Sequence, residues 1–262
     1  MLNKRKQEGS YRMYLRILKR DLKRNKTMNI ILLLFTILAA TFVASGLNNV
    51  ITILNGTDYF FEKAGLMDYV VFTQFGDGGT TQILDKCAEV KEYRAERCIW
   101  ASNDDVTIDG KKLSSKNKTL VIQPISEKQQ KFFLENNEQL SNVKSGEIYI
   151  TAGILKKNNI KVGDTMRVRV QDVDKSFLIA GEIKDALLGS DMMGNTRLVM
   201  NPEDYEVFAN SEKLKPYEGR IIHVSTDNTK AVEADLTNAS NILFSSGRAT
   251  IKTSYVMDLI VA

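Results

Sequence analysis

The chain has 262 residues, of which 43% are hydrophobic and 26% are charged, and its formal net charge is +4. Its one histidine and two cysteines are too few for the usual zinc sites, so we expect no such metal centre and no resident cofactor. The sequence also lacks a G-x-x-x-x-G-K-[ST] segment and a G-x-S-x-G elbow, which excludes a P-loop nucleotide site and the usual platform for serine hydrolysis. We therefore expect no enzyme activity.

Charge is distributed unevenly along the chain. Residues 1–26 carry ten basic and two acidic side chains, whereas the rest of the chain carries 26 basic and 30 acidic ones. Because Lys and Arg stay on the cytoplasmic side of a membrane, we expect the amino terminus inside and residues after about 55 outside. The outer region is net acidic, and the lysines at its predicted hairpin tip have no interleaved aromatic residues, which argues against nucleic-acid binding.

Residues 1–27 are predicted to form a basic amphipathic helix in the cytoplasm. Tyr and Leu side chains recur at helical spacing from Tyr11 to Leu22 on one face, and Arg and Lys line the other. Such a helix can lie among the headgroups and contact anionic membrane lipid. Two interpretations stay open: an elbow that contacts a partner protein or, as periodicity alone favours, a positively charged flank of a membrane anchor.

Residues 28–54 are predicted to form a transmembrane helix. No charged side chain occurs from Thr27 to Thr57, and the most apolar part, residues 30–47, would span about 27 Å at about 1.5 Å per residue. A cleaved signal peptide with a small-residue site at residues 43–45 is the alternative, but this apolar run is longer than such peptides have. We therefore expect a retained single span in a bacterial cytoplasmic membrane.

Two similar segments, residues 55–113 and 214–262, flank a different middle region. Each has the pattern of a strand, a helix and a strand. The predicted elements are strand 67–74, helix 80–92 and extended stretch 97–108 with a turn at Asp109-Gly110, then strand 220–226, helix 229–243 and strand 249–256. Together they predict an α+β fold in which an extracytoplasmic split-βαβ, ferredoxin-like subdomain carries an insertion.

The insertion, residues 114–213, is predicted to be a β-rich subdomain. Its predicted strands are 119–123, 146–151, 165–170, 175–184 and 197–200, and its predicted helices are 127–135, 152–157 and one that opens at Asn201-Pro202. The strand 165–170 alternates strictly between apolar and polar side chains, so we expect it to pair with 175–184 across a turn at Asp172 to Asp174.

Few residues outside the predicted membrane anchor are candidates for catalysis, metal binding or disulfide formation. The sole histidine, His223, falls inside a predicted apolar strand, which favours a structural role. Residues 103–105 (Asn-Asp-Asp) lack the glycine and distal glutamate of an EF-hand loop, so a solvated turn is favoured over a calcium site. Cys87 and Cys98 would face an oxidising exterior, which leaves open both a disulfide and two buried free thiols.

Several motifs of the middle region occur in an informative order. Residues 146–150 (GEIYI), a short helix and residues 161–164 (KVGD) lead into an alternating strand, and residues 177–185 and 196–202 follow. Behind a basic leader and a single span, this arrangement resembles the start of an FtsX-like, MacB-type ABC transporter permease, with its first membrane helix and its periplasmic core domain.

The resemblance implies a permease subunit that works with a cytoplasmic ABC ATPase on another chain and with a second permease copy or homologue. ATP hydrolysis would move the membrane helices and with them the extracytoplasmic domain, for export or for mechanical transmission. On this reading, Arg16, Lys19 and Arg20 of the leader are the candidate contacts with the ATPase. Permeases of this kind have three further spans, so residues 254–262 are interpreted as the approach to a second one.

The candidate contacts with an extracytoplasmic partner protein or peptide lie in the predicted loop 185–195. Leu187, Leu188, Met192 and Met193 place apolar side chains on a glycine-bearing loop that we expect to be exposed. Packing onto the neighbouring subdomain is an equal alternative for these side chains. The alternative function for the whole chain is a single-pass, membrane-anchored extracytoplasmic binding or sensor module.

Overall fold

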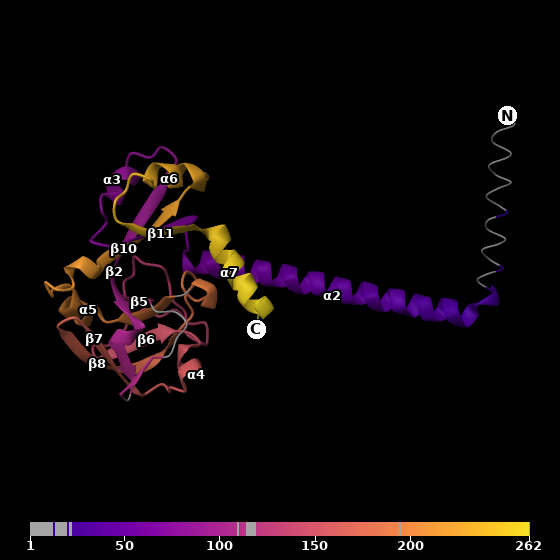
Figure 1. Cartoon of the computed structure of the whole chain (residues 1–262), viewed down its shortest axis with the longest axis horizontal. Coiled ribbons are helices and arrows are strands. Elements are labelled where there is room, and N and C mark those ends of the chain that lie inside the picture. The colour runs from indigo at the N-terminus through magenta and orange to yellow at the C-terminus, as the bar shows by residue number, and fades with distance from the viewer. Residues whose placement is uncertain are drawn as a thin grey trace. The chain divides into compact units, whose positions relative to one another are not determined.

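The computed structural model describes residues 13, 20, 23–108, 110–113, 119–193 and 195–261 of the chain. The chain divides into two compact units, residues 1–53 and 54–262. Helix α2 (Lys26–Ala64) contributes its last turns to the second unit, which also contains every described strand (Figure 1). The fold class is mixed α+β, with a long apolar helix followed by a large mixed sheet.

α2 is an apolar helix whose side chains are almost all exposed from residue 26 to residue 52. Thr36 and Thr41 donate their hydroxyl protons to the carbonyls of Leu32 and Ile37 at 2.9 and 2.8 Å, which satisfies polar groups on an apolar surface. Among the described residues, α2 is the one helix that is long and apolar enough to cross a membrane. The predicted span, residues 28–54, lies within this helix.

The described strands form one sheet. They are β1 (Tyr69–Thr73), β2 (Glu92–Ser102), β3 (Val106–Ile108), β4 (Lys111–Lys112), β5 (Thr119–Pro124), β6 (Glu147–Thr151), β7 (Thr165–Val170), β8 (Val173–Ile183), β9 (Asn195–Met200), β10 (Glu218–Ser225) and β11 (Ile242–Gly247). Their order in the sheet is β11-β1-β10-β2-β5-β9-β6-β8-β7-β3-β4. β2 pairs with β10 along its first part and with β5 at its end. It therefore connects the strands β11, β1 and β10, which together with β2 we call the outer part of the sheet, to the strands from β5 to β4 in this order, which we call the inner part.

The outer part of the sheet consists of β11, β1, β10 and β2, each antiparallel to its neighbour. Two short helices, α3 (Thr80–Leu84) and α6 (Thr229–Leu236), lie beside each other against these strands (Figure 1). Their buried side chains pack with β1 and β10 in one apolar cluster, which includes Val71, Leu84, Ile222, Val224, Val232 and Leu236. Burial of this cluster fixes the helices on one face of the outer strands.

The inner part of the sheet mixes strand directions. β5 is parallel to β9 and β6 is parallel to β8, whereas β6 and β9, β7 and β8, and β3 and β7 are antiparallel. The predicted pairing of 165–170 with 175–184 is confirmed by β7 and β8, but the turn lies earlier than predicted, because Val173 already belongs to β8 and pairs with Val170. The short helices α4 (Ile154–Asn158) and α5 (Pro202–Ala209) pack onto the core of this part.

The predicted helix start at Asn201-Pro202 is also confirmed. The Asn201 side chain accepts a hydrogen bond from the Glu203 backbone N–H at 2.8 Å, and Pro202 occupies the first turn of α5. At the other predicted tight turn, β3 and β4 form a hairpin, although Asp109 itself lies outside the described residues. β3 pairs with β7, so this hairpin extends the inner part of the sheet.

Two predictions in the last segment are wrong. The predicted strand 249–256 is helix α7 (Arg248–Val261), because helical spacing buries Ile251 while it leaves Thr253 exposed. The predicted helix 229–243 ends at Leu236. The Thr, Asn and Ser residues that follow are poor helix formers, and the chain from residue 242 onward forms β11 against β1 instead.

Two further predicted helices differ from the structure. The helix predicted at 80–92 ends at Leu84, and β2 begins at Glu92 to pair with β10. The helix predicted at 127–135 is absent, because the backbone of this segment bonds to other elements. Lys131 donates its backbone N–H to the Ala64 carbonyl at 2.9 Å, and Phe133 donates to the Lys184 carbonyl at 3.3 Å. We call residues 125–143 the strap.

Cys87 and Cys98 are buried free thiols, so the disulfide alternative does not hold. Burial raises the pKa of Cys98 to about 12, and it also raises the pKa of Cys87. Both thiols therefore stay protonated at neutral pH and behave as small apolar groups.

Candidate functional site

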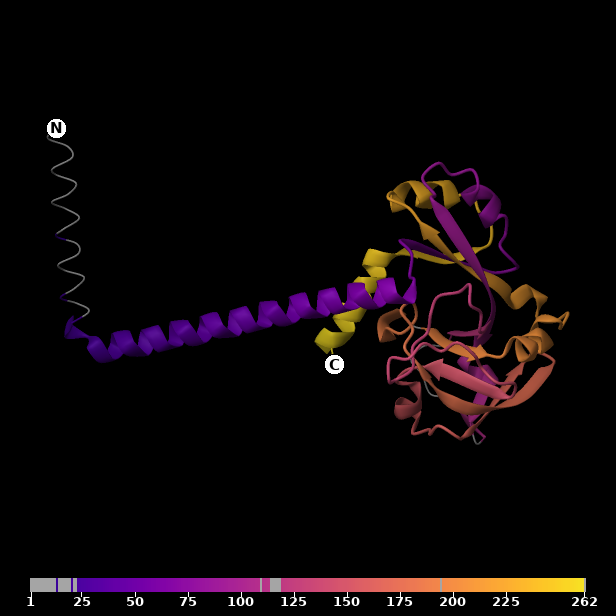
Figure 2. The ribbon, with the colours of Figure 1, turned by 180° about the vertical axis from the view of Figure 1, so that it is seen from behind.

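The last turns of α2 and helix α7 meet at one place in the second unit, which we call the helix junction (Figure 2). Phe61 of α2 and Tyr255 of α7 face each other edge to face, with ring centroids 5.5 Å apart and planes at 73°. Phe61 and Ile251 are fully buried in the same apolar cluster. The junction therefore fixes the end of α2 to α7 through apolar packing.

Charged side chains at helical spacing complete the junction. Asp58 and Glu62 lie one turn apart on α2, and Arg248 and Lys252 lie one turn apart on α7. Lys252 pairs with Asp58 at 2.6 Å, and Arg248 approaches Glu62 at 3.9 Å. Because these side chains are partly exposed, the pairs set the registry of the two helices more than they add stability.

The connection between β8 and β9 forms the third side of the junction. The Asp185 carboxylate accepts hydrogen bonds from the backbone N–H groups of Leu187 and Leu188 at 2.9 and 3.1 Å, which holds the chain in a turn. The Tyr255 hydroxyl donates to the Asp185 carbonyl. Burial raises the pKa of Tyr255, so this hydroxyl remains a donor at neutral pH.

Behind the turn, Asp185 belongs to a buried ion pair. Arg197 Nε lies 2.7 Å from Asp185 Oδ2, and neither side chain is exposed to solvent. Arg197 also donates to the Gln123 side chain, and its guanidinium lies 5.0 Å from the centre of the Phe132 ring in the strap. Gln130 Nε2 donates to Asp185 at 2.9 Å, so strap, turn and sheet share one polar network.

The network continues to a buried carboxylate on β2. Glu96 accepts hydrogen bonds from Gln123 Nε2 and from the Gln130 backbone N–H, both at 2.7 Å, and lies 3.2 Å from Nε2 of His223. Burial alone would raise the pKa of Glu96, but His223, Arg197 and Arg94 lower it to about 2. Glu96 is therefore a charged structural residue, and His223 lies buried beside it in β10.

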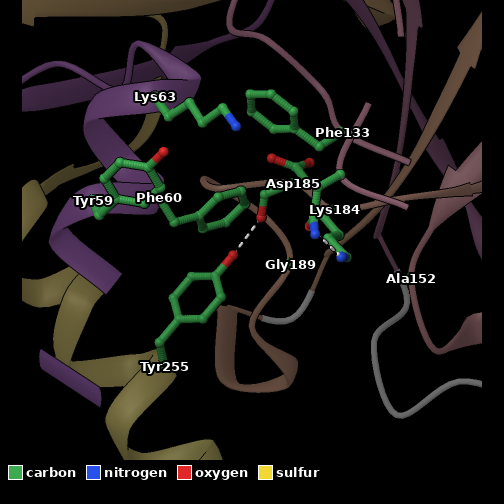
Figure 3. A pocket seen from close by; sticks show the side chains of 10 residues that line it. Tyr59, Phe60, Lys63, Phe133, Ala152, Lys184, Asp185, Gly189 and Tyr255 are labelled. Carbon is green, nitrogen blue, oxygen red and sulfur yellow. Dashed lines mark hydrogen bonds between the residues drawn. The ribbon is translucent and has the colours of Figure 1, made fainter. Parts of the chain in front are cut away.

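A pocket of about 610 Å³ opens beside the junction (Figure 3). It is lined by Tyr59, Phe60, Lys63, Phe133, Asn137, Ala152, Lys184, Asp185, Gly189 and Tyr255. These residues come from α2, the strap, the turn between β6 and α4, the β8–β9 connection and α7, so five segments of the sequence form the walls. Figure 3 shows the Lys63 side chain extending from α2 toward the ring of Phe133.

The predicted partner contacts in the β8–β9 connection divide into two pairs. Leu187 and Leu188 are 0% and 1% exposed, so the expectation that they are exposed is wrong; they pack in the apolar cluster beneath the junction. Met193 is half-buried against the same cluster, whereas Met192 is 59% exposed in a short 3-10 helix, residues 191–193. Partner contact at Met192 stays a prediction.

The predicted ATPase contacts fall mostly outside the part of the chain that the structure describes. Arg16 and Lys19 lie outside it, and Arg20 is exposed and helical. Among the described residues, no group of three or more His, Cys, Asp or Glu side chains is placed to hold a metal ion.

No known protein family and no curated protein matches this chain. Among solved structures, a chain from Bacillus anthracis that is described as a lipoprotein has a TM-score of 0.38 and 10% identity, over 69% of this chain and 96% of that one. A domain from Porphyromonas gingivalis that is described as part of a permease protein has a TM-score of 0.34 and 12% identity, over 62% and 76%. Both likenesses are too distant to assign a family or a function.

Proposed function

We propose that this chain is the membrane-anchored, extracytoplasmic part of an FtsX-like, MacB-type ABC transporter permease. α2 crosses a bacterial cytoplasmic membrane, the amino terminus lies inside, and residues after about 55 lie outside. A separate cytoplasmic ATPase supplies the energy, and a second permease copy or homologue completes the assembly. The module transmits movement for export or for mechanical work, and catalyses no reaction itself.

The helix junction carries this proposal. α2 is apolar enough to cross a membrane, and its last turn is buried in the core of the second unit at Phe61 and Ala64. The strap is bonded to the Ala64 carbonyl, and α7 is bonded to the same turns by Lys252. Movement of these turns would therefore displace the strap and α7 together, as a transmission element requires.

The finer fold is part of the same proposal. Residues 55–113 and 214–262 form a split-βαβ, porter-like subdomain, and residues 114–213 form a β-rich, sabre-like insertion. The antiparallel order β11-β1-β10-β2 supports this arrangement, because one helix follows β1 and another follows β10, as two interleaved βαβ units require.

Orientation is tested by cysteine labelling of the full chain in intact cells, with Cys87 and Cys98 replaced by alanine. Lys111→Cys, at the exposed strand β4, is expected to react with a membrane-impermeant maleimide without lysis. Arg20→Cys is expected to react only after lysis. Labelling of Arg20→Cys in intact cells, or protection of Lys111→Cys, would contradict the proposed topology.

ATPase coupling is tested by co-purification of the full chain with the ABC ATPases of its own cell, identified by mass spectrometry. Simultaneous Arg16→Glu, Lys19→Glu and Arg20→Glu substitutions are expected to lower ATPase recovery by about tenfold or more, because they reverse a complementary charged contact. The matched control reverses three exposed lysines of the second unit, Lys86, Lys111 and Lys213, and should retain the ATPase.

The second candidate function is a single-pass anchored binding or sensor module, and the pocket beside the junction favours it. The two candidates differ in their dependence on an ATPase. If residues after 55 label from outside while no ATPase co-purifies with the unmodified chain, the permease proposal fails and the binding module stands.

A further inference from the structure

We infer that the pocket beside the helix junction binds an apolar organic anion, with its carboxylate or phosphate at Lys63 and its apolar part against Phe60, Phe133 and Tyr255. The volume of about 610 Å³ lies within the range of about 300–1,000 Å³ that small-molecule sites occupy. The inference does not depend on coupling to an ATPase, because it rests on the walls of the pocket alone.

The walls provide an apolar surface built from aromatic rings. Phe60 is half-buried, and its ring centroid lies 6.2 Å from that of Phe133 and 6.5 Å from that of Tyr255. Phe133 is itself buried in the strap, and the Tyr255 hydroxyl is already bonded to the Asp185 carbonyl. These rings are therefore held in place before a ligand arrives, which lowers the entropy cost of binding.

The pocket carries uncompensated positive charge. Lys63 Nζ lies 5.2 Å from the centre of the Phe133 ring and 5.9 Å from that of Tyr59. The two acidic side chains in the same turns of α2, Asp58 and Glu62, contact basic residues of α7. None of the ion pairs that the described residues form includes Lys63.

The second lysine of the pocket adds to this charge. Lys184 Nζ donates to the Glu135 carbonyl at 2.9 Å and to Asn137 Oδ1 at 2.7 Å, and both acceptors are neutral. The one carboxylate in the lining, Asp185, is neutralised by its buried ion pair with Arg197. Two ammonium groups beside aromatic walls therefore favour a ligand that is both apolar and anionic. They would repel a cationic ligand, and a neutral ligand would form no ion pair with them.

The inference is tested by calorimetric titration of the full chain in nanodiscs of zwitterionic lipid, with empty discs as the blank. The probes share one apolar body and differ in charge: 4-phenylbutyrate, 4-phenylbutanol and 4-phenylbutylamine. We expect 4-phenylbutyrate to bind one to one and about tenfold more tightly than the alcohol, the effect of one charge-assisted hydrogen bond, and the amine to bind more weakly than either.

Variants separate the anion contact from the apolar one. Lys63→Gln is expected to remove the preference for the acid over the alcohol, whereas Lys63→Arg keeps it. Phe60→Ala is expected to weaken both probes alike. Lys86→Gln, at an exposed lysine outside the pocket, is the matched control and should bind as the unmodified chain does.

Three results would overturn the inference: no saturable binding of 4-phenylbutyrate, equal or tighter binding of the alcohol or the amine, or an unchanged preference in Lys63→Gln. Failure of the ATPase co-purification leaves this titration unaffected, so the two proposals can fail separately.

Discussion

Arg197 and Asp185 form an ion pair whose side chains are both 0% exposed. Arg197→Met removes the cation and leaves the Asp185 carboxylate buried without its partner, so we expect a loss of about 3–5 kcal/mol in the free energy of unfolding. Urea unfolding followed by the fluorescence of Trp100, the one tryptophan, measures this loss. Arg167→Met, at the exposed pair with Asp174, is the control and should cost far less.

Glu96 makes the free energy of unfolding of the second unit depend on pH in the acidic range. Its native pKa of about 2 lies below the ordinary value of 4.5, so the unfolded chain binds more protons between these values. Its stabilisation is therefore complete above pH 4.5 and falls as the pH approaches 2, by about 3 kcal/mol for this shift.

Unfolding measured between pH 6 and pH 2 should accordingly show a steeper acid loss for the unmodified chain than for Glu96→Gln. Glu138→Gln, at an exposed side chain, is the matched control and should follow the unmodified chain. Parallel curves for Glu96→Gln and the unmodified chain would show that Glu96 does not carry this pH dependence.

These buried charges could not be recognised from the sequence. Arg197 lies in a segment that was correctly predicted as a strand, but the prediction gave no reason to bury its guanidinium. Its burial depends on Asp185 twelve residues earlier and on Gln123 from β5, which only the fold brings together. The sequence offered only a weak signal, a charged residue directly before the apolar residues Leu198, Val199 and Met200.

At the scale of elements, Tyr255 is the side chain that connects α7 to both the α2 end and the β8–β9 connection. Tyr255→Phe removes only the hydrogen bond to the Asp185 carbonyl, for which we expect a loss of about 1 kcal/mol. Tyr255→Ala also removes the ring contacts and should cost more. Amide hydrogen exchange should therefore accelerate in α7 for Tyr255→Ala and less for Tyr255→Phe.

The control for this measurement is inside the same protein. Protection of the β7–β8 hairpin, whose two strands pair with each other from Thr165 to Leu178, should stay unchanged in both variants. Equal acceleration throughout the sheet would mean that α7 and the sheet unfold as one cooperative unit, which contradicts a separable junction.

Secondary-structure elements whose pattern, turn and cap residues lie within their own sequence were predictable. Elements whose conformation depends on contacts with residues far away in the sequence were not. In the β7–β8 hairpin, β7 alternates strictly up to a tight turn, and α5 has its own cap. The residues of α7 are compatible with strand or helix by pattern, and their helical state is fixed by contacts with α2. The strap bonds through its backbone to Ala64 of α2 and to Lys184 of the β8–β9 connection, and these hydrogen bonds replace those of the predicted helix.

At the scale of the whole molecule, the mixed α+β class and the apolar helix were predictable because composition and hydropathy are properties of long segments. The site was less predictable. Of the four loop residues predicted to contact a partner, two are buried, and the pocket combines residues from five segments that have no common sequence pattern.

The pairing of β1 has a consequence for biogenesis. Tyr69 pairs with Val224 and with Gly247, so both neighbours of this early strand are synthesised long after it. Until they arrive, β1 exposes unpaired backbone groups and the apolar side chains of a central strand, the kind of segment that chaperones bind and proteases cut. Quality control during folding is therefore expected to act on β1 until β10 and β11 have been synthesised.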